Sequence, residues 1–215
     1  MLATKRLSVF LLVLAPVLAM SDLRAQTPQV QVRGVMGSAS YGPANSTTSP
    51  LILGKGAAVP IGAVVKTGPG SAVDLAFSHN MGVVRVLQNS TLSLDKFSVP
   101  ESSAPGAIEL QLNLMAGTMA GFGQKPSPSA RCQIKVAHGI ADVSGAKYRL
   151  DAQGYLVLLE GTAMFVLVPP SGEPVPFELK APRALYFSPV EGVRAAPDEL
   201  VREVTWQMKG QLRKR

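Results

Sequence analysis

Residue types that build catalytic and metal sites are scarce in this sequence. Its 215 residues include one Cys, two His and one Trp, and only 16% of them are charged. A single cysteine excludes an intramolecular disulfide and a metal site with several thiolate ligands. The charged share is well below the ~25% of ordinary soluble domains. Hydrophobic residues reach 47%, too many for a disordered chain. The composition therefore indicates a folded chain with one good core or two small ones.

No arrangement of nucleophiles, bases or carboxylates indicates catalysis. We expect His79 and His138 to be solvated turn histidines, since each lies where a strand pattern ends. Cys132 is interpreted as a packed thiol, with pairing between molecules as the alternative in an oxidising compartment. A glycosidase needs two carboxylates about 5–9 Å apart, and nothing in the sequence selects such a pair. The acids of the predicted strands are scattered singly: Asp74, Asp95, Glu109, Asp142, Asp151, Glu160 and Glu178. We therefore predict no enzyme, no cofactor and no metal site.

The net charge of +7 invites a nucleic-acid-binding interpretation. Residues 1–25 contain three basic residues and one acidic residue, and residues 198–215 contain five basic and three acidic residues. Each segment thus carries +2, and a net charge of only +3 remains over residues 26–197. Tracking a phosphate backbone needs clustered Lys and Arg, often with aromatic side chains for stacking. No such cluster is present, and the sequence predicts no nucleic-acid partner.

The N-terminus has the pattern of an export signal. Lys5 and Arg6 precede an uncharged run over residues 7–20, with small-residue cleavage sites at Ala19 and Ala25. A run of this length suits a secretory signal, whereas a membrane span needs about 20 apolar residues. We predict a cleavable signal peptide over residues 1–25, with a retained anchor as the alternative. No cysteine follows directly after this run, and this excludes a lipoprotein anchor.

The body of the chain has the periodicity of β-strands. Residues 73–77 and 108–114 alternate apolar and polar side chains, and residues 156–159 form a nearly continuous apolar run typical of a strand covered on both faces. Twenty Gly and seventeen Pro punctuate these runs. Predicted turns, loops and breaks are residues 67–70, 79–82 and 151–154 (turns), 38–50 and 100–106 (surface loops) and 124–130 (the best internal break). We expect an all-β fold of two stacked layers in one domain.

The period changes near the C-terminus. Leu200, Val204, Met208 and Leu212 recur at helical spacing after an acidic start at Asp198. We predict an amphipathic basic helix or tail over residues 198–215 that caps a sheet. Docking of this helix on a partner or on an anionic membrane is the alternative.

The order and spacing of the β segments resemble the periplasmic FecR domain. The segments that carry the resemblance are GAAVPIGAVVKTG (56–68), GSAVDLAF (70–77), VVRV (83–86), STLSL (90–94), LNLMAG (112–117), VAHGIADVSGAKYRL (136–150) and YLVLLEGTAMFV (155–166). The chain departs from the family at Ala146, where Thr usually follows Gly145, and at Ala137, where Thr-Pro is common. The resemblance covers roughly residues 30–170, and we expect a FecR-like all-β domain over residues 26–197.

The resemblance implies a short β-solenoid or a two-layer β-sandwich without catalysis. FecR regulators carry a cytoplasmic anti-sigma segment, one membrane helix and this domain outside, where it receives a signal from an outer-membrane transducer. Only four residues precede Lys5, so we expect a stand-alone exported module.

The expected function is that of a non-catalytic, extracytoplasmic binding or scaffold module of a bacterial cell envelope, periplasmic or at the cell surface. Its expected partner is an envelope protein or a polysaccharide. The alternatives are a component of a sigma/anti-sigma relay with an outer-membrane receptor, and a secreted carbohydrate-active enzyme.

Overall fold

The computed structural model describes residues 28–43, 50–100, 107–125, 127–188 and 192–195, together with Arg202 and Val204. These residues form eighteen strands in two nine-stranded sheets. Sheet A runs from edge to edge through β18 (Gly192–Ala195), β17 (Arg183–Ser188), β14 (Tyr155–Glu160), β13 (Lys147–Asp151), β10 (Thr118–Gly123), β7 (Gly82–Val86), β6 (Ala72–Phe77), β1 (Val30–Met36) and β4 (Ala58–Val59). Sheet B runs through β16 (Val175–Lys180), β15 (Thr162–Leu167), β12 (Gly139–Asp142), β11 (Arg131–Val136), β9 (Glu109–Ala116), β8 (Thr91–Ser98), β5 (Ala63–Thr67), β2 (Ala39–Pro43) and β3 (Leu51–Ile52).

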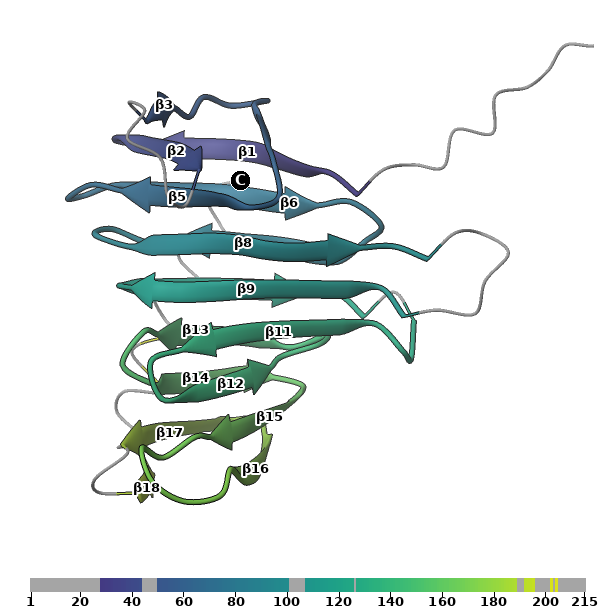
Figure 1. The fold of residues 1–215 in the computed structure, drawn as a ribbon, viewed down its shortest axis with the longest axis vertical. Coiled ribbons are helices and arrows are strands. Elements are labelled where there is room, and N and C mark those ends of the chain that lie inside the picture. The colour runs from purple at the N-terminus through teal and green to yellow at the C-terminus, as the bar shows by residue number, and fades with distance from the viewer. Residues whose placement is uncertain are drawn as a thin grey trace, which may run out of the picture.

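The two sheets are the layers of an elongated sandwich, with the first strands at one end and the last at the other (Figure 1). The chain crosses to the opposite sheet after every one or two strands. Neighbouring described strands are antiparallel except β9 and β11, which are parallel because β10 lies between them in sequence but belongs to sheet A. The path β9–β10–β11 is thus one solenoid-like coil within a sandwich. The predicted all-β, two-layer architecture is confirmed.

One apolar core fills the space between the sheets. The predicted alternation is confirmed over residues 108–114, where Leu110, Leu112 and Leu114 are buried and the intervening polar side chains are not. Aromatic contacts join the two layers: Phe165 in sheet B stacks on Phe187 in sheet A with ring centroids 3.6 Å apart. The core therefore depends on inward residues of both sheets along the whole length of the sandwich.

Hydroxyl side chains bind together the corners where the chain changes sheet. The Thr67 hydroxyl, at the end of β5, donates to the Leu87 carbonyl and accepts from the Ser90 N–H at 3.1 Å. The Ser90 hydroxyl in turn accepts from the Thr118 N–H at 2.9 Å. Gly117 has φ +78°, and a Cβ there would lie 2.2 Å from the Ser90 oxygen, so this corner requires glycine. The corners thus fix how the strands of the two sheets follow one another.

Most predicted turns are confirmed, and one predicted loop is wrong. Residues 67–70, 79–82 and 151–154 each connect two strands, and 124–130 lies between β10 and β11. Residues 38–50 were expected to be a surface loop, but residues 39–43 form β2, which pairs with β5. Its Gly and Pro disfavour a strand, yet Ala39 is buried and the ladder to β5 outweighs this propensity.

The two predicted terminal segments are barely included in the described residues. The predicted signal peptide over 1–25 lies outside them, as do residues 101–106 of the loop predicted over 100–106. Of the predicted tail over 198–215, only Arg202 and Val204 are described, and both are helical. Within the described ranges, no helix is long and apolar enough to cross a membrane.

Candidate functional site

The outward side of sheet A carries a continuous row of paired residues. Because directly paired residues on neighbouring strands point to the same face of a sheet, the register places their side chains side by side. The row, from β1 to β17, is Gly34, Asp74, Arg85, Ala120, Arg149, Val157 and Ala184. The row contains three charged residues, Asp74, Arg85 and Arg149, among small and apolar ones.

A groove of about 1100 Å³ lies over this row and the adjoining strand ends. Its walls come from sheet A, from the sheet-crossing corners and from Val204 near the C-terminus. Among the described residues that line it, four are charged, namely Asp74, Arg85, Arg149 and Asp151. Acidic and basic side chains are thus interspersed in this part of the groove.

Asp74 and Arg85 form a two-pronged ion pair across β6 and β7. The Arg85 Nε donates to Asp74 Oδ1 at 2.6 Å, and its Nη2 donates to Oδ2 at 2.7 Å. Both side chains are largely shielded from water, with exposed fractions of 12% for Asp74 and 18% for Arg85. Hydrogen bonding to Asp74 raises the pKa of Arg85 further, although burial opposes this. The guanidinium is thus held in one orientation in the groove.

Asp151 organises the other end of the groove. One of its oxygens accepts from the Gln153 N–H at 2.7 Å, and the other accepts from the Thr118 hydroxyl at 3.0 Å. Beside it, the rings of Tyr155 and Tyr186 lie with centroids 5.6 Å apart at 38°. Partial burial raises the pKa of the Tyr155 hydroxyl above its ordinary value of 10.0, so this phenol remains a hydrogen-bond donor at neutral pH. Aromatic surface and polar groups therefore meet in one place.

Part of the outer side of sheet A is covered. Ala120, Val157 and Ala184 point outward yet are almost completely buried, in one cluster with Val204. We call these three strand residues the covered face. Val204 belongs to the predicted C-terminal amphipathic segment, and it packs on the flat side of sheet A. Val204 thus covers part of the flat outer side of sheet A, and the capping helix predicted over 198–215 lies mostly outside the described residues.

The outer side of sheet B at the same level of the sandwich is uncovered. Its two rows of paired residues over β9, β11, β12, β15 and β16, which we call the open face, are Asn113, Lys135, Ile140, Val166 and Pro176, and Gln111, Gln133, Asp142, Met164 and Glu178. All ten are half-buried or exposed. Ile140 and Met164 are 39% and 43% exposed, which is unusual for large apolar side chains in paired strands.

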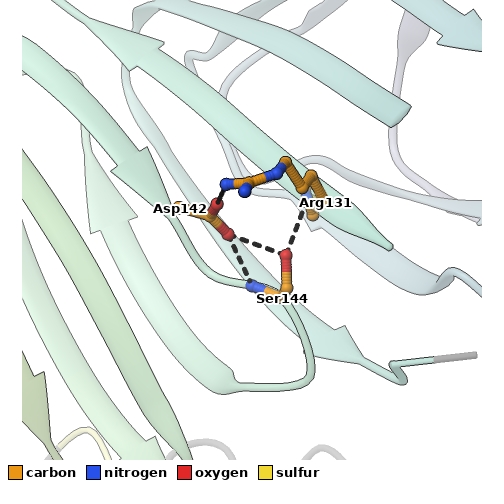
Figure 2. A network of polar contacts seen from close by, with 4 residues as sticks. Arg131, Asp142 and Ser144 are labelled. Atoms are coloured by element: carbon orange, nitrogen blue, oxygen red, sulfur yellow. Dashed lines mark hydrogen bonds and ion pairs between the residues drawn. The ribbon is translucent and has the colours of Figure 1, made fainter. Parts of the chain in front are cut away.

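A polar network stabilises the border of the open face (Figure 2). The Ser144 hydroxyl donates to Asp142 Oδ1 at 2.7 Å and accepts from the Cys132 N–H at 2.8 Å, while Arg131 lies 3.5 Å from the other oxygen of Asp142. The network ties the turn after β12 to the start of β11. Both carboxylate oxygens of Asp142 therefore take part in contacts that hold this turn in place.

The residues weighed for catalysis are not assembled. His79 lies in a turn with φ +56° and its Nδ1 is 2.9 Å from the Ser78 hydroxyl, and His138 lies in the β11–β12 turn. Cys132 is buried, which raises the pKa of its thiol to about 12, and the predicted packed thiol is confirmed. In the described part of the chain, no three His, Cys, Asp or Glu residues group as a metal site would require.

The acids singled out in the sequence mostly have structural partners. Besides Asp74, Asp142 and Asp151, three more are paired: Asp95 accepts from the Ser93 hydroxyl, Glu109 binds Lys96, and Glu160 binds Lys147. The structure brings Asp74 and Asp151 into one groove, where the sequence showed no relation between them. Sequence reasoning missed Arg85, Arg149, Tyr155 and Tyr186. The sequence indicates only that each lies on the outward side of its own strand, and the four strands are separate.

Comparison with known proteins finds a family match for the central part of the chain. The family model described as FecR protein matches residues 63–164, and this match confirms the resemblance of the β segments to the FecR domain. No curated protein matches the chain. Two crystal structures of a candidate anti-sigma factor from Parabacteroides distasonis ATCC 8503 are similar at 10% and 9% identity with TM-scores of 0.46. The matches cover 62% of this chain and 58% of those chains, less than two thirds of their length.

Proposed function

We propose that the chain is a non-catalytic, extracytoplasmic binding module of a bacterial cell envelope, and that the open face of sheet B holds a protein partner. The FecR match over residues 63–164 supports a signalling-related module that binds other proteins. The export pattern of residues 1–25 supports a place outside the cytoplasm. The structural partners of the paired acids support a role in binding in preference to hydrolysis.

The observation that carries this proposal is the exposed apolar pair on the open face. Ile140 and Met164 lie in neighbouring rows of β12 and β15, which pair directly. Around them are amide and charged side chains such as Gln133, Lys135 and Glu178. An apolar centre with a polar rim is the composition of a protein interface, and methionine adapts to the shape of a partner.

Cross-linking in the envelope tests this surface. The chain is expressed in its own host, cross-linked in intact cells and purified, and its partners are identified by mass spectrometry. We expect the double variant Ile140→Asp, Met164→Asp to lose a protein partner, because charged side chains replace both apolar residues at the centre of the surface. The matched control is Leu51→Asp, Ile52→Asp, which changes two exposed apolar residues of β3 at the far end of sheet B.

Retention of every partner by the open-face variant, or loss of the same partner by the control, would overturn the assignment of the surface. Finding no cross-linked protein at all would overturn the binding role itself. Hydrolysis of a polysaccharide that a single Asp or Glu substitution abolishes would replace the module by an enzyme.

The FecR match also favours a specific version of this function, a component of envelope-to-cytoplasm signalling. In that case the cross-linked partner is an outer-membrane receptor or a membrane-bound sigma-factor regulator. A partner of another class, such as a surface-assembly protein, would leave the binding module intact and remove the relay.

A further inference from the structure

The apolar centre of the open face on sheet B extends beyond Ile140 and Met164. Val166 follows Met164 on the outward side of β15 and is half-buried, and Val168, two residues further along the chain, is 45% exposed. The Val168 N–H donates to the His138 carbonyl at 2.9 Å, so the pairing of β15 with the segment before β12 continues as far as this residue. Apolar side chains gathered on one exposed surface mark a place where another molecule binds.

Charged side chains of opposite sign flank this apolar centre. The two rows of the open face contain three charged residues, and one of them, Asp142, is held by Ser144 and Arg131. The other two, Lys135 and Glu178, are exposed and have no ion-pair partner among the described residues. Lys135 lies on β11 and Glu178 on β16, with β12 and β15 between them. Because neighbouring strands are about 4.8 Å apart, the two residues lie roughly 14 Å from each other across the sheet and cannot pair within one copy.

A two-fold axis between β12 and β15 satisfies the apolar centre and the two charges together. When two copies meet face to face about this axis, β12 of each copy lies over β15 of the other, and β11 lies over β16. Ile140 of each copy then packs on Met164 and Val166 of the other. Lys135 of each copy meets Glu178 of the other, which gives two ion pairs. A two-fold contact requires such a self-complementary surface, and the charge pairs fix its register. We propose that two copies of this chain cover each other's open faces in a symmetric dimer when no other partner is bound.

The size of the open face makes this dimer a weak one. Five strands at a spacing of about 4.8 Å, with an average length of about six residues, cover on the order of 400 Å² of flat sheet. A stable protein interface buries about 800 Å² on each partner. We therefore expect a dissociation constant on the order of 10–100 μM. The inference rests on the proposed function, because it concerns the same open face, and it adds a regulation: an envelope partner that binds the open face more tightly displaces the second copy.

Sedimentation velocity of the purified full chain at concentrations from about 5 to 500 μM measures this association. Lys135→Glu and Glu178→Lys each turn both attractive pairs into repulsive ones, and each should weaken the dimer at least about tenfold. An equal mixture of these two variants should associate as the parent does, because every altered charge then meets an opposite charge on the other copy. The matched control is Lys66→Glu, which reverses the charge of an exposed lysine on the outer side of β5, outside the open face, and should dimerise as the parent does.

A parent chain that remains monomeric up to about 500 μM would overturn the inference. Equal weakening by Lys66→Glu would also overturn it, as would a mixture that associates no better than either variant alone. Circular dichroism of each variant establishes that it is folded, and the double variant Lys135→Glu, Glu178→Lys, which should dimerise as the parent does, gives a second test of the pairing.

The failure of this inference is distinguishable from the failure of the proposed function. A monomeric parent whose open face still cross-links an envelope protein in cells would remove the dimer and leave the proposed function standing. A dimer in cells without any other cross-linked protein would uphold the inference and remove the envelope partner.

Discussion

The covered face of sheet A and the open face of sheet B lie back to back across the same core, and they differ in every surface property. Ala120, Val157 and Ala184 are buried beneath Val204, whereas Ile140 and Met164 remain exposed. Beside the covered face is a groove whose described lining includes both acidic and basic residues, and the open face is a broad mixture of amide, charged and apolar groups. The two sheets have the same number of strands, yet their outer surfaces differ.

The difference shows what each sheet contributes beyond the core. Sheet A uses small residues and an ion pair to make room for a groove, and its remaining apolar residues need the segment around Val204 for burial. Sheet B needs no such cover, because its outward residues are mainly polar. The two faces therefore differ in shape, with a groove on sheet A and a broad exposed strand surface on sheet B.

The largest expected effect comes from placing one charge on each face. Val157→Asp takes a carboxylate out of water in the cluster of Ala120, Ala184 and Val204. Although Arg149 is its neighbour on β13, the cost of burying the charge should still lower the free energy of unfolding by about 2 kcal/mol. The matched Ile140→Asp remains hydrated at the open face and should cost less than about 1 kcal/mol. Urea denaturation followed by circular dichroism measures both. Equal losses in the two variants would show that the faces are equally covered.

An effect of similar size is expected from breaking one ion pair on each sheet. Asp74→Asn removes the charge from the two-pronged, shielded pair with Arg85, and the free energy of unfolding should fall by about 1.5–3 kcal/mol. Glu109→Gln removes the exposed pair with Lys96 on sheet B and should lower the urea midpoint only slightly, because solvent screens such pairs. An equal fall of the midpoint in both variants would contradict the difference in shielding.

The same exposed pair gives a dependence on pH with a defined sign. Hydrogen bonding and attraction by Lys96 lower the pKa of Glu109 below 4.5 in the folded state. Its contribution to stability is therefore present above pH 4.5 and is lost as the pH falls through the lowered pKa. Urea midpoints of the parent and Glu109→Gln, compared at pH 7 and pH 3, should converge at the lower pH. A difference that grows on acidification would reverse this sign.

The fold could be predicted from sequence because its strands obey a period of two. Residues 108–114 have a single apolar face, and their burial follows directly. The uninterrupted run over residues 156–159 correctly indicated that Val157 is covered on its outer side as well. Residues 39–43 could not be predicted as a strand, because their Gly and Pro conceal pairing with β5, a contact that depends on tertiary structure.

The groove could not be predicted, because its residues are brought together by register. Arg85 and Arg149 are far apart in sequence, and only the alignment of β7, β10 and β13 places them on either side of Ala120. Tyr186 meets Tyr155 through the pairing of β14 with β17. Periodicity assigns each side chain to a face of its own strand, but it gives no information on which strands are neighbours.

The central claim, that the covered face is shielded and the open face is not, is tested most directly by thiol labelling. Val157→Cys and Ile140→Cys are treated separately with a maleimide at pH 8. Native Cys132 is an internal control, since burial raises its pKa to about 12 and should keep it unmodified. In the full chain, we predict that the introduced thiol of Val157→Cys reacts at least about tenfold more slowly than that of Ile140→Cys. In a chain that ends at residue 195 and therefore lacks Val204, the labelling rates of the two introduced thiols should become similar. Equal labelling rates of the two thiols in the full chain would contradict the account.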